Sequence, residues 1–349
     1  MRLLNCMWSA EPAFKSVHLV LSHFIAAVAP TQQANVFLMG DACQQNLLAQ
    51  AESFQSKKKA TKKLIATYFL RRKWLGKIQE FNPDVVVVDG LGMARLLLPV
   101  LEKYHSARVL IYFHGQTKFT AKDVALLTRH YKFSLKLIAV SQTLATNISH
   151  LLPHLDVLAI PTYLDLPNKV SQPKTESSTV VLGAVGRLVD DKNFAVLLEC
   201  MSQLVAKGLP VSLIIAGEGK CRQALENQIT QLGLNQQVTL LGQVDDMDAF
   251  YQGIDLLLVP SQQEGQGLVV QEAIHYGKPV ICSDLAVFKE QLSDSGVYCA
   301  SGEVGQWSRA CELYMSIEAR LQLFERQQIQ HQSYNTAQLF AQRCVAACV

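Results

Sequence analysis

The sequence predicts an α/β protein with two Rossmann-like, doubly wound domains facing a cleft, and three observations support that prediction. The chain of 349 residues is too long for one compact core and suits two domains. Hydrophobic residues make up 49% and charged residues 17%, which indicates a globular chain rich in buried strands. Short apolar segments alternate with helical segments in both halves, as expected for parallel sheets covered on both faces.

In the first half, six apolar segments are expected to form strands. Uninterrupted runs such as Val85–Val88 are typical of strands buried on both faces. Helices are expected between the strands, for example at 17–28 and 91–104. The expected strands are 3–8, 35–39, 84–89, 108–113, 135–140 and 157–160.

After a linker at 161–178, which is rich in Pro, Asn, Ser and Thr, the same alternation restarts. Expected strands lie at 180–185, 211–216, 238–241, 256–259 and 280–282. A helix after Asn193 is predicted by a buried face formed by Phe194, Leu197, Leu198, Met201 and Val205. We therefore expect an α/β domain at 1–160, a second at 179–325, and a helical segment at 326–349 that packs back on the first domain.

The cysteines and the uncharged stretches favour a cytoplasmic protein. The nine cysteines are odd in number and show no C-x-x-C spacing, which indicates reduced and mostly buried thiols. No secretory signal is expected at the start of the sequence. The longest uncharged run, 16–40, contains His18, Pro30 and Asn35 and reads as a helix followed by a strand, not as a membrane span.

Residues 259–273 combine a strand end, a glycine-containing loop and a helix that begins near Gly267. Unpaired backbone N–H groups at a helix start, together with the helix dipole, form an anion site. Glu264 in the loop and Glu272 in the helix offer carboxylates to the hydroxyls of a sugar and a ribose. The spacing alone leaves open two unrelated surface acids.

A second stretch, 186–193, follows the first strand of the second half. Arg187 leaves the strand end and Lys192 opens the next helix, so both cations are expected to face the same site. Two fixed cations beside a helix start would neutralise a diphosphate. The alternative is a pair of solvated loop charges.

Together these stretches resemble the retaining glycosyltransferases of family four, which have the two-domain GT-B fold. The resemblance covers residues 179 to about 300, and its motifs occur in a specific order. They are Gly186-Arg187-Leu188 with Asp191-Lys192-Asn193, Ala216-Gly217-Glu218-Gly219, Leu240-Leu241-Gly242, Tyr251 with Asp255, Pro260-Ser261, the pair Glu264 and Glu272, Gly277-Lys278-Pro279-Val280, and Ser283-Asp284.

The resemblance implies a role for each matching residue. Arg187 and Lys192 would hold the diphosphate, Glu264 the sugar hydroxyls and Glu272 the ribose hydroxyls. The backbone of Gly217 and the N–H groups of Gly267, Leu268 and Val269 would also contact the donor. The implied catalytic residues are Glu264, His114, Arg187 and Lys192. Gln266 stands where the family usually has an aromatic residue, so the wall of the sugar subsite departs from the family pattern.

In the first half the resemblance is thinner and centres on Phe113-His114-Gly115 at a strand end. It implies that His114 lies against the donor sugar and the acceptor. The alternative is a strand-end histidine that bonds a neighbouring loop. The glycine pair that usually follows the first strand of the family is replaced by residues 10–15.

Asp246-Met247-Asp248 matches the Asp-x-Asp pattern by which another glycosyltransferase fold holds a divalent metal. Here the acids precede a predicted helix, where they would cap its amino end. We expect no essential metal and no cofactor besides the nucleotide sugar as co-substrate.

A predicted helix at about 55–80 contains a basic segment that the glycosyltransferase motifs do not explain. Residues 1–170 hold 20 Lys and Arg against 10 Asp and Glu, whereas the rest of the chain is acidic. On a helical wheel Leu64, Tyr68, Leu75 and Ile78 share one side. Such helices lie on anionic membranes, and no nucleic-acid motif accompanies this one. The predicted membrane-binding residues are Lys57, Lys58, Lys59, Lys62, Lys63, Arg71, Arg72, Lys73 and Lys77. A solvated helix face is the alternative.

These expectations combine into one hypothesis. The protein would transfer a hexose-type sugar, with retention, from a UDP-sugar to a lipopolysaccharide core or another lipid-linked glycan. It would work in the cytoplasm, peripherally bound to the inner face of the membrane. The alternatives are a GT-B-type sugar-nucleotide epimerase, which acts on the donor alone, and a non-catalytic relative that only binds sugar nucleotides.

Overall fold

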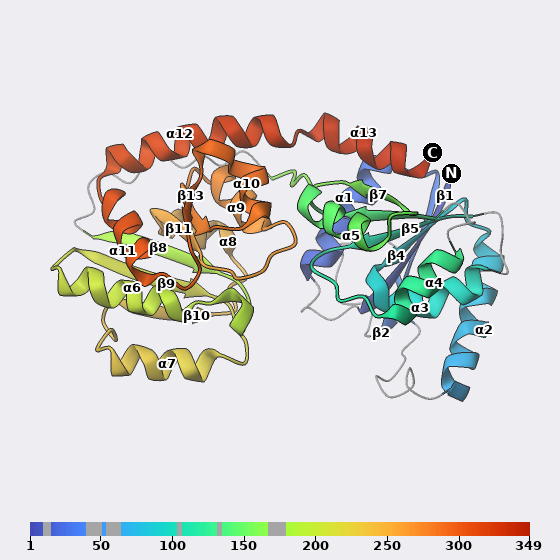
Figure 1. Cartoon of the computed structure of the whole chain (residues 1–349), viewed down its shortest axis with the longest axis horizontal. Helices are drawn as coiled ribbons and strands as arrows, with labels where there is room; N and C mark the ends of the chain where they lie inside the picture. The colour runs from blue at the N-terminus through green and yellow to red at the C-terminus, as the bar shows by residue number, and fades with distance from the viewer. Residues whose placement is uncertain (10–14, 40–50, 54–63, 103–106, 131–134, 167–178) are drawn as a thin grey trace. The chain divides into compact units, whose positions relative to one another are not determined.

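The computed structural model describes residues 1–9, 15–39, 51–53, 64–102, 107–130, 135–166 and 179–349. They fold as two compact units, each shown in Figure 1. Unit 1 comprises Met1–Tyr163 together with Thr336–Val349, and unit 2 comprises Leu164–Asn335. The predicted linker falls mostly outside the described residues, at 167–178.

Unit 1 contains a parallel sheet of seven strands in the order β3-β2-β1-β4-β5-β6-β7. The strands are β1 (Arg2–Ser9), β2 (Gln32–Met39), β3 (Ala51–Ser53), β4 (Val85–Asp89), β5 (Arg108–Phe113), β6 (Leu135–Ala139) and β7 (Asp156–Ala159). The helices are α1 (Lys15–Val28), α2 (Leu64–Phe81), α3 (Gly90–Leu101), α4 (Ala121–His130), α5 (Gln142–Leu151) and α13 (Ala337–Cys348).

Unit 2 contains a parallel sheet of six strands in the order β10-β9-β8-β11-β12-β13. The strands are β8 (Val180–Val185), β9 (Val211–Ala216), β10 (Val238–Gly242), β11 (Leu256–Val259), β12 (Val280–Ser283) and β13 (Val297–Cys299). The helices are α6 (Ala195–Ala206), α7 (Arg222–Gln231), α8 (Met247–Gly253), α9 (Leu268–His275), α10 (Ala286–Leu292), α11 (Val304–Leu313) and α12 (Ile317–Tyr334).

Both sheets are doubly wound, which confirms the predicted fold class. The strand order reverses between β1 and β4 in unit 1 and between β8 and β11 in unit 2. At such a switch point the two connections leave in opposite directions, and ligands bind beyond the carboxyl ends of the strands. The residues that follow β8 and β11 are therefore placed where a ligand is expected.

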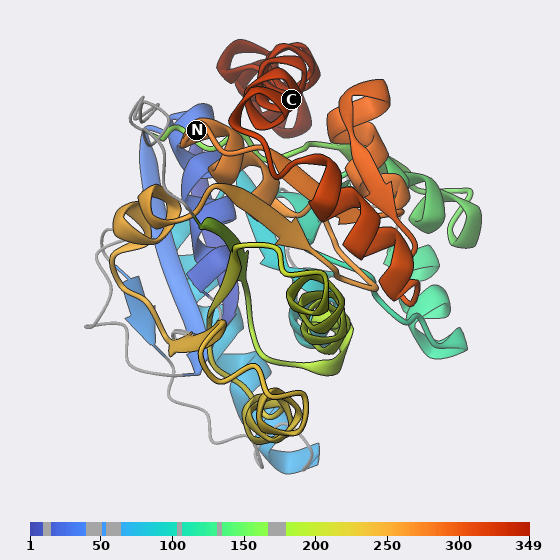
Figure 2. The same ribbon diagram turned by 90° about the vertical axis from the view of Figure 1, so that its left-hand side faces the viewer.

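The sheet of unit 2 has a hydrophobic core on each face. One core contains residues of α6, α7 and α11, and the other contains residues of α8, α9 and α10 together with Phe324 of α12. Figure 2 looks onto this unit and shows α6 and α7 end-on. The predicted buried face of α6 is confirmed, because Phe194, Leu197 and Met201 are all buried.

The carboxyl-terminal helix belongs to unit 1. Helix α12 ends at Tyr334, and α13 then packs against α1 and contacts β5. Arg108 of β5 donates to the carbonyl of Cys348, and Lys136 Nζ donates to the Ala346 carbonyl at 3.4 Å. The carbonyls at the end of α13, which have no partner within the helix, thus bond cations of the sheet, where the helix dipole also favours positive charge.

Burial lowers the pKa of His331 in α12 from its ordinary 6.5 to about 4. Its Nδ1 has no hydrogen-bond partner among the described residues. The folded state favours the neutral imidazole ring. The stability that His331 contributes is therefore present above pH 6.5 and is lost as the pH falls toward 4. Between pH 7 and pH 5, the free energy of unfolding should fall by about 2 kcal/mol more in the wild type than in His331→Leu. Urea titrations at both pH values measure this; equal falls would contradict it.

Candidate functional site

The switch point of unit 2 brings together two of the loops singled out in the sequence. The loop after β8 carries Arg187 and Lys192, and the loop after β11 carries Glu264. The Gln262 N–H donates to the Asp191 carbonyl at 2.8 Å, which joins the two loops through their backbones. Lys192 and Glu264, which are 72 residues apart in the sequence, thereby lie in one polar site at the carboxyl ends of adjacent strands.

Lys192 and Glu264 form an ion pair at the centre of this site, through Nζ and Oε1. Ser261 Oγ donates to the same Oε1 at 2.8 Å. The pair is partly buried, with 22% of the lysine side chain and 12% of the glutamate side chain exposed. The lysine is therefore a positioned cation, and its charge is balanced by the carboxylate that the sequence assigned to the sugar.

Local backbone conformation places Lys192. Asp190–Lys192 form a single 3₁₀ turn, which ends at Asn193 in the left-handed region with φ of 52°. Asparagine tolerates this conformation better than most residues. Its Nδ2 also donates to the Ser301 carbonyl at 2.6 Å, so the turn is held from outside as well as by its own bonds.

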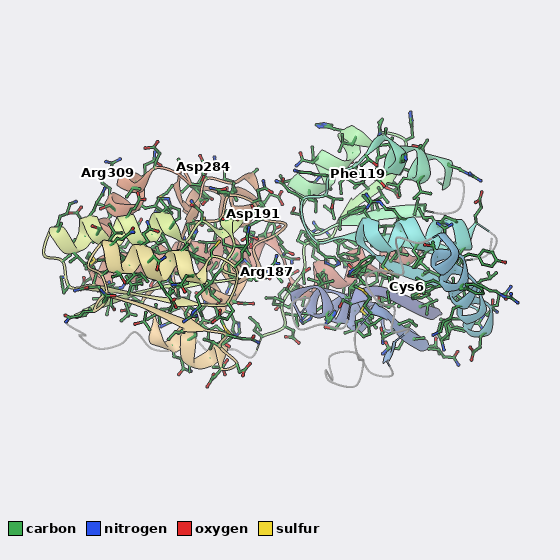
Figure 3. The ribbon with its side chains drawn as sticks, turned by 90° about the horizontal axis from the view of Figure 1, so that it is seen from below. Cys6, Phe119, Arg187, Asp191, Asp284 and Arg309 are labelled. Atoms are coloured by element: carbon green, nitrogen blue, oxygen red, sulfur yellow. The ribbon has the colours of Figure 1, made fainter. Side chains whose placement is uncertain are left out.

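Arg187 is exposed, and its guanidinium forms no hydrogen bond or ion pair with any other residue that the structure describes. Figure 3 shows Arg187 and Asp191 on one side of unit 2, well separated from Arg309. Arg187 and Lys192 therefore belong to the same loop but have different surroundings. Arg187 is solvated, whereas Lys192 is paired.

Gly267 begins the third component of the site, helix α9. It occupies the left-handed region, with φ of 79° and ψ of 60°. A Cβ there would lie 2.5 Å from a ring carbon of Phe288, so glycine suits both the backbone and the packing. The Val270 N–H bonds the Gly267 carbonyl. The N–H groups of Gly267, Leu268 and Val269 precede it at the helix start, where an anion is favoured.

Gln266, at the position that departs from the family pattern, is buried. Its carbonyl accepts a hydrogen bond from Nε2 of Gln291 in α10, a residue with no exposed surface. The loop that leads into α9 is therefore held by the helix beneath it. Nothing in the spacing of the sequence motifs indicated Gln291.

Glu272 is held by an aromatic residue to which the sequence assigned no role. Tyr251 Oη donates to Glu272 Oε2 at 2.7 Å. The Tyr251 ring stacks on Tyr276, with centroids 4.8 Å apart and planes 9° apart. Tyr251 is one of the residues of the motif series. Its contact with Glu272 could not be predicted, because it depends on how α8 packs against α9.

The two acids of the Asp-x-Asp pattern have separate roles. Asp246 caps α8, because its carboxylate accepts from the Ala249 N–H at 2.9 Å, and this part of the prediction is confirmed. Asp248 lies in the first turn of α8, where the helix dipole favours a negative charge. Its carboxylate accepts from the hydroxyl of Tyr276.

These contacts allow the prediction that no metal is essential to be tested at Asp248. Activity should persist in excess chelator, and Asp248→Asn should mainly lower stability, by about 1–3 kcal/mol, because it weakens a charge-assisted bond to Tyr276. Turnover with and without chelator, together with thermal unfolding of the variant, measures both effects. Complete loss of activity in chelator, restored by manganese, would contradict the prediction.

In unit 1, His114 follows β5 at the carboxyl edge of the sheet. Its Nε2 lies 3.4 Å from Asp89 Oδ1 at the end of β4, and its ring stacks on Tyr112 with centroids 5.1 Å apart. Neither ring nitrogen meets hydrogen-bond geometry with any described residue. Asp89 also accepts from the Trp8 N–H at 3.1 Å, at the end of β1. His114 is thus positioned by a neighbouring carboxylate and an aromatic face, and its role in turnover stays a prediction.

The basic segment is only partly described. Lys57, Lys58, Lys59, Lys62 and Lys63 lie outside the described residues, and α2 begins at Leu64. Within α2, Arg72 and Lys73 are exposed. Arg71 instead donates to the Arg95 carbonyl at 3.2 Å, and only 16% of the Lys77 side chain is exposed.

The predicted division of this helix into two sides is wrong in part. Tyr68 is 63% exposed, as is its neighbour Phe69 at 62%, whereas Trp74 and Ile78 are completely buried. The side facing the protein is therefore set by Leu70, Trp74 and Ile78, at four-residue spacing. None of the helices in the described ranges has the length and apolar character needed to cross a membrane.

Comparison with known proteins gives a family match for part of the chain. Residues 167–332, just under half of the chain, match the family model described as glycosyl transferases group 1. The match includes all three components of the unit 2 site, so the resemblance of the ordered motifs to a glycosyltransferase domain is confirmed.

Curated relatives of this group 1 domain cover part of the chain. An uncharacterized glycosyltransferase of Haemophilus influenzae is 26% identical over 51% of the chain and 50% of its own length. The lipopolysaccharide core biosynthesis mannosyltransferase LpsB of Rhizobium meliloti is 24% identical over 53% of the chain and 61% of its own length. The chain spans about half to three fifths of the length of these two curated relatives.

Solved structures share the fold over the whole chain. The Anabaena protein HepE in complex with UDP-glucose superposes with a TM-score of 0.82 at 17% identity, covering 99% of this chain and 98% of that one. The lipopolysaccharide outer core galactosyltransferase WaaB, in its apo form, gives a TM-score of 0.76 at 16% identity, covering 99% of both chains. At these identities the likeness concerns the fold.

Proposed function

We propose that the protein is a retaining glycosyltransferase that moves a hexose-type sugar from a UDP-sugar to a lipopolysaccharide core or another lipid-linked glycan. The observation that carries the proposal is the partly buried Lys192–Glu264 pair, placed at the switch point with the start of α9. HepE, which shares the fold, binds UDP-glucose. LpsB and WaaB, named for lipopolysaccharide core sugars, support the acceptor class.

The site residues fit a departing diphosphate. Lys192 and Arg187, with the N–H groups of Gly267 to Val269, would stabilise the charge that grows on the diphosphate as its bond to the anomeric carbon breaks. Glu264 would accept from sugar hydroxyls. The acceptor oxygen would bond the anomeric carbon from the face that the diphosphate leaves, and its proton would pass to the leaving phosphate oxygen. No protein base is then required.

A donor screen tests the proposal. Nucleotide sugars that differ in base and sugar would be incubated with the protein, and stabilisation against heat and release of nucleoside diphosphate would be measured. We expect UDP-sugars to raise Tm and to be hydrolysed slowly without acceptor. Recovery of an epimerised donor without release of UDP would instead favour the epimerase alternative, and binding without any turnover would favour the non-catalytic one.

We further propose that the protein docks on the inner face of the cytoplasmic membrane through the basic segment and α2. The exposed pair Tyr68 and Phe69 lies in the same helix as the exposed Arg72 and Lys73. Aromatic rings beside cations suit the interface of an anionic bilayer. Each nearby Lys or Arg adds about 1 kcal/mol of attraction, and this attraction is screened within about 10 Å at 0.1 M salt.

Replacing Lys58, Lys59, Lys62 and Lys63 by Gln is expected to weaken binding to anionic vesicles at least about tenfold and to slow transfer to a lipid acceptor. Donor hydrolysis in solution should hardly change, because the donor site lies in unit 2. Vesicle co-sedimentation with and without anionic lipid, at low and high salt, measures the effect. As a control, three exposed lysines of unit 2, Lys207, Lys220 and Lys289, are replaced by Gln, and vesicle binding should stay near that of the wild type. Equal binding by the wild type and the four-lysine variant would show that these lysines form a solvated surface and do not bind the membrane.

A further inference from the structure

The carboxylate of Glu272 has a fixed direction, because a fully buried hydroxyl holds it. Tyr251 has no exposed surface, and its Oη lies 2.7 Å from Glu272 Oε2. Tyr251 belongs to α8, whereas Glu272 lies in the second turn of α9. The bond therefore fixes the acid to the neighbouring helix and not only to its own.

Tyr251 is in turn fixed by its surroundings. Its ring stacks on Tyr276 and meets the edge of Phe250, with centroids 5.2 Å apart and planes 74° apart. Tyr276 is buried, and its hydroxyl donates to Asp248 in the first turn of α8. The two tyrosines thus form two parallel cross-links between α8 and α9, each ending on a carboxylate.

Burial, with the charge of Glu272 as a second cause, raises the pKa of Tyr251 well above its ordinary value. The phenol is therefore a proton donor throughout the physiological pH range. A hydrogen bond to a charged acceptor stabilises more than a neutral one, by about 1.5–3 kcal/mol. A rigid donor of this kind selects one rotamer of the carboxylate before any ligand arrives.

We infer that Tyr251 is a positioning residue that fixes Glu272 to accept from the ribose hydroxyls, so that the site selects ribonucleoside over deoxyribonucleoside diphosphates. The inference rests on the proposed function, in which Glu272 contacts the ribose. A site built to bond a substrate hydroxyl rejects the analogue that lacks it, because the polar group of the site then loses its partner. The rejection is strong only when the carboxylate cannot turn away to water.

The test compares UDP with 2′,3′-dideoxy-UDP by titration calorimetry. The wild type should bind UDP at least tenfold more tightly than the dideoxy analogue. Tyr251→Phe keeps the ring and its stacking but removes the hydroxyl. It should reduce this ratio below threefold, with the loss confined to UDP. Glu272→Gln should reduce the ratio in the same way, and the double variant should show no further reduction.

Tyr298→Phe is the matched control, because it also removes one tyrosine hydroxyl of unit 2, which bonds the Ser293 carbonyl at 2.7 Å. It should keep the wild-type ratio. A merely structural role for Tyr251 would weaken both ligands equally and leave the ratio unchanged, which would overturn the inference while the proposed function stands. If Tyr251→Phe fails to fold, an unchanged ratio in Glu272→Gln overturns it. A wild type that binds neither ligand removes the proposed function and the inference together.

Discussion

Replacing Lys192 or Arg187 by alanine is expected to lower kcat/KM up to about a thousandfold, which abolishes measurable turnover, while the protein still folds. In the proposed mechanism each change removes a cation from the place where charge grows on the leaving diphosphate, and single groups of this kind contribute about a hundred- to a thousandfold. For Lys192 the loss is compounded, because Glu264 is left partly buried without its counter-ion. Turnover of the donor selected by the screen, with circular dichroism and thermal unfolding, measures both parts of the prediction.

Lys220→Ala supplies the control for this experiment. Lys220 is a lysine of the same unit that also forms an ion pair, with Asp190, but its side chain is 69% exposed. Its loss should cost little stability and leave the rate near that of the wild type. A folded Lys192→Ala or Arg187→Ala variant that works at the wild-type rate would remove the diphosphate assignment.

The candidate site of unit 2 shows how much could be predicted from the sequence. Arg187, Lys192 and Glu264 could be assigned to one site because parallel strands present their carboxyl ends, and hence their following loops, at the same edge. The Lys192–Glu264 ion pair could not be predicted. It depends on the turn at Asp190–Lys192 and on side-chain conformations, which the spacing of motifs leaves open. The same is true of Tyr251 and Glu272, whose bond requires α8 to pack against α9.

The fold, too, could be predicted from the sequence only in part. Long apolar runs such as those of β4 and β8 predicted strands well, because burial on both faces leaves a continuous signal. The strands β3 and β13 have three residues each and were not predicted, since so short a segment contains little periodicity. In α2 the position of Tyr68 was misjudged, because an aromatic residue suits both a core and an exposed interface. Only the packing of Trp74 and Ile78 decides which side of the helix is buried.

Gly217→Ala is expected to destabilise unit 2 strongly. Gly217 follows β9 with φ of 141°, a backbone conformation that alanine rarely adopts. A Cβ there would overlap the carbonyl oxygen of Gly186, the residue before Arg187. The Gly186 N–H bonds the Ala216 carbonyl, and the Gly217 N–H bonds the Gly242 carbonyl at 2.7 Å, so neither strand end can move without losing a bond. Strain and overlap together should lower the free energy of unfolding by about 2–5 kcal/mol.

The overlap also involves the candidate site, since relieving the overlap displaces the backbone that carries Arg187. Any Gly217→Ala protein that folds should therefore lose the stabilisation that a donor gives to the wild type. Gly208→Ala separates the two causes, because Gly208 has φ of 74° but nothing within 4 Å of an added Cβ. It should lose about 1 kcal/mol from backbone strain alone and keep its response to the donor. Urea denaturation with and without donor compares the variants. If the two variants lose the same free energy of unfolding, backbone strain alone explains the need for glycine at position 217. The close packing of Gly217 against Gly186 would then contribute nothing.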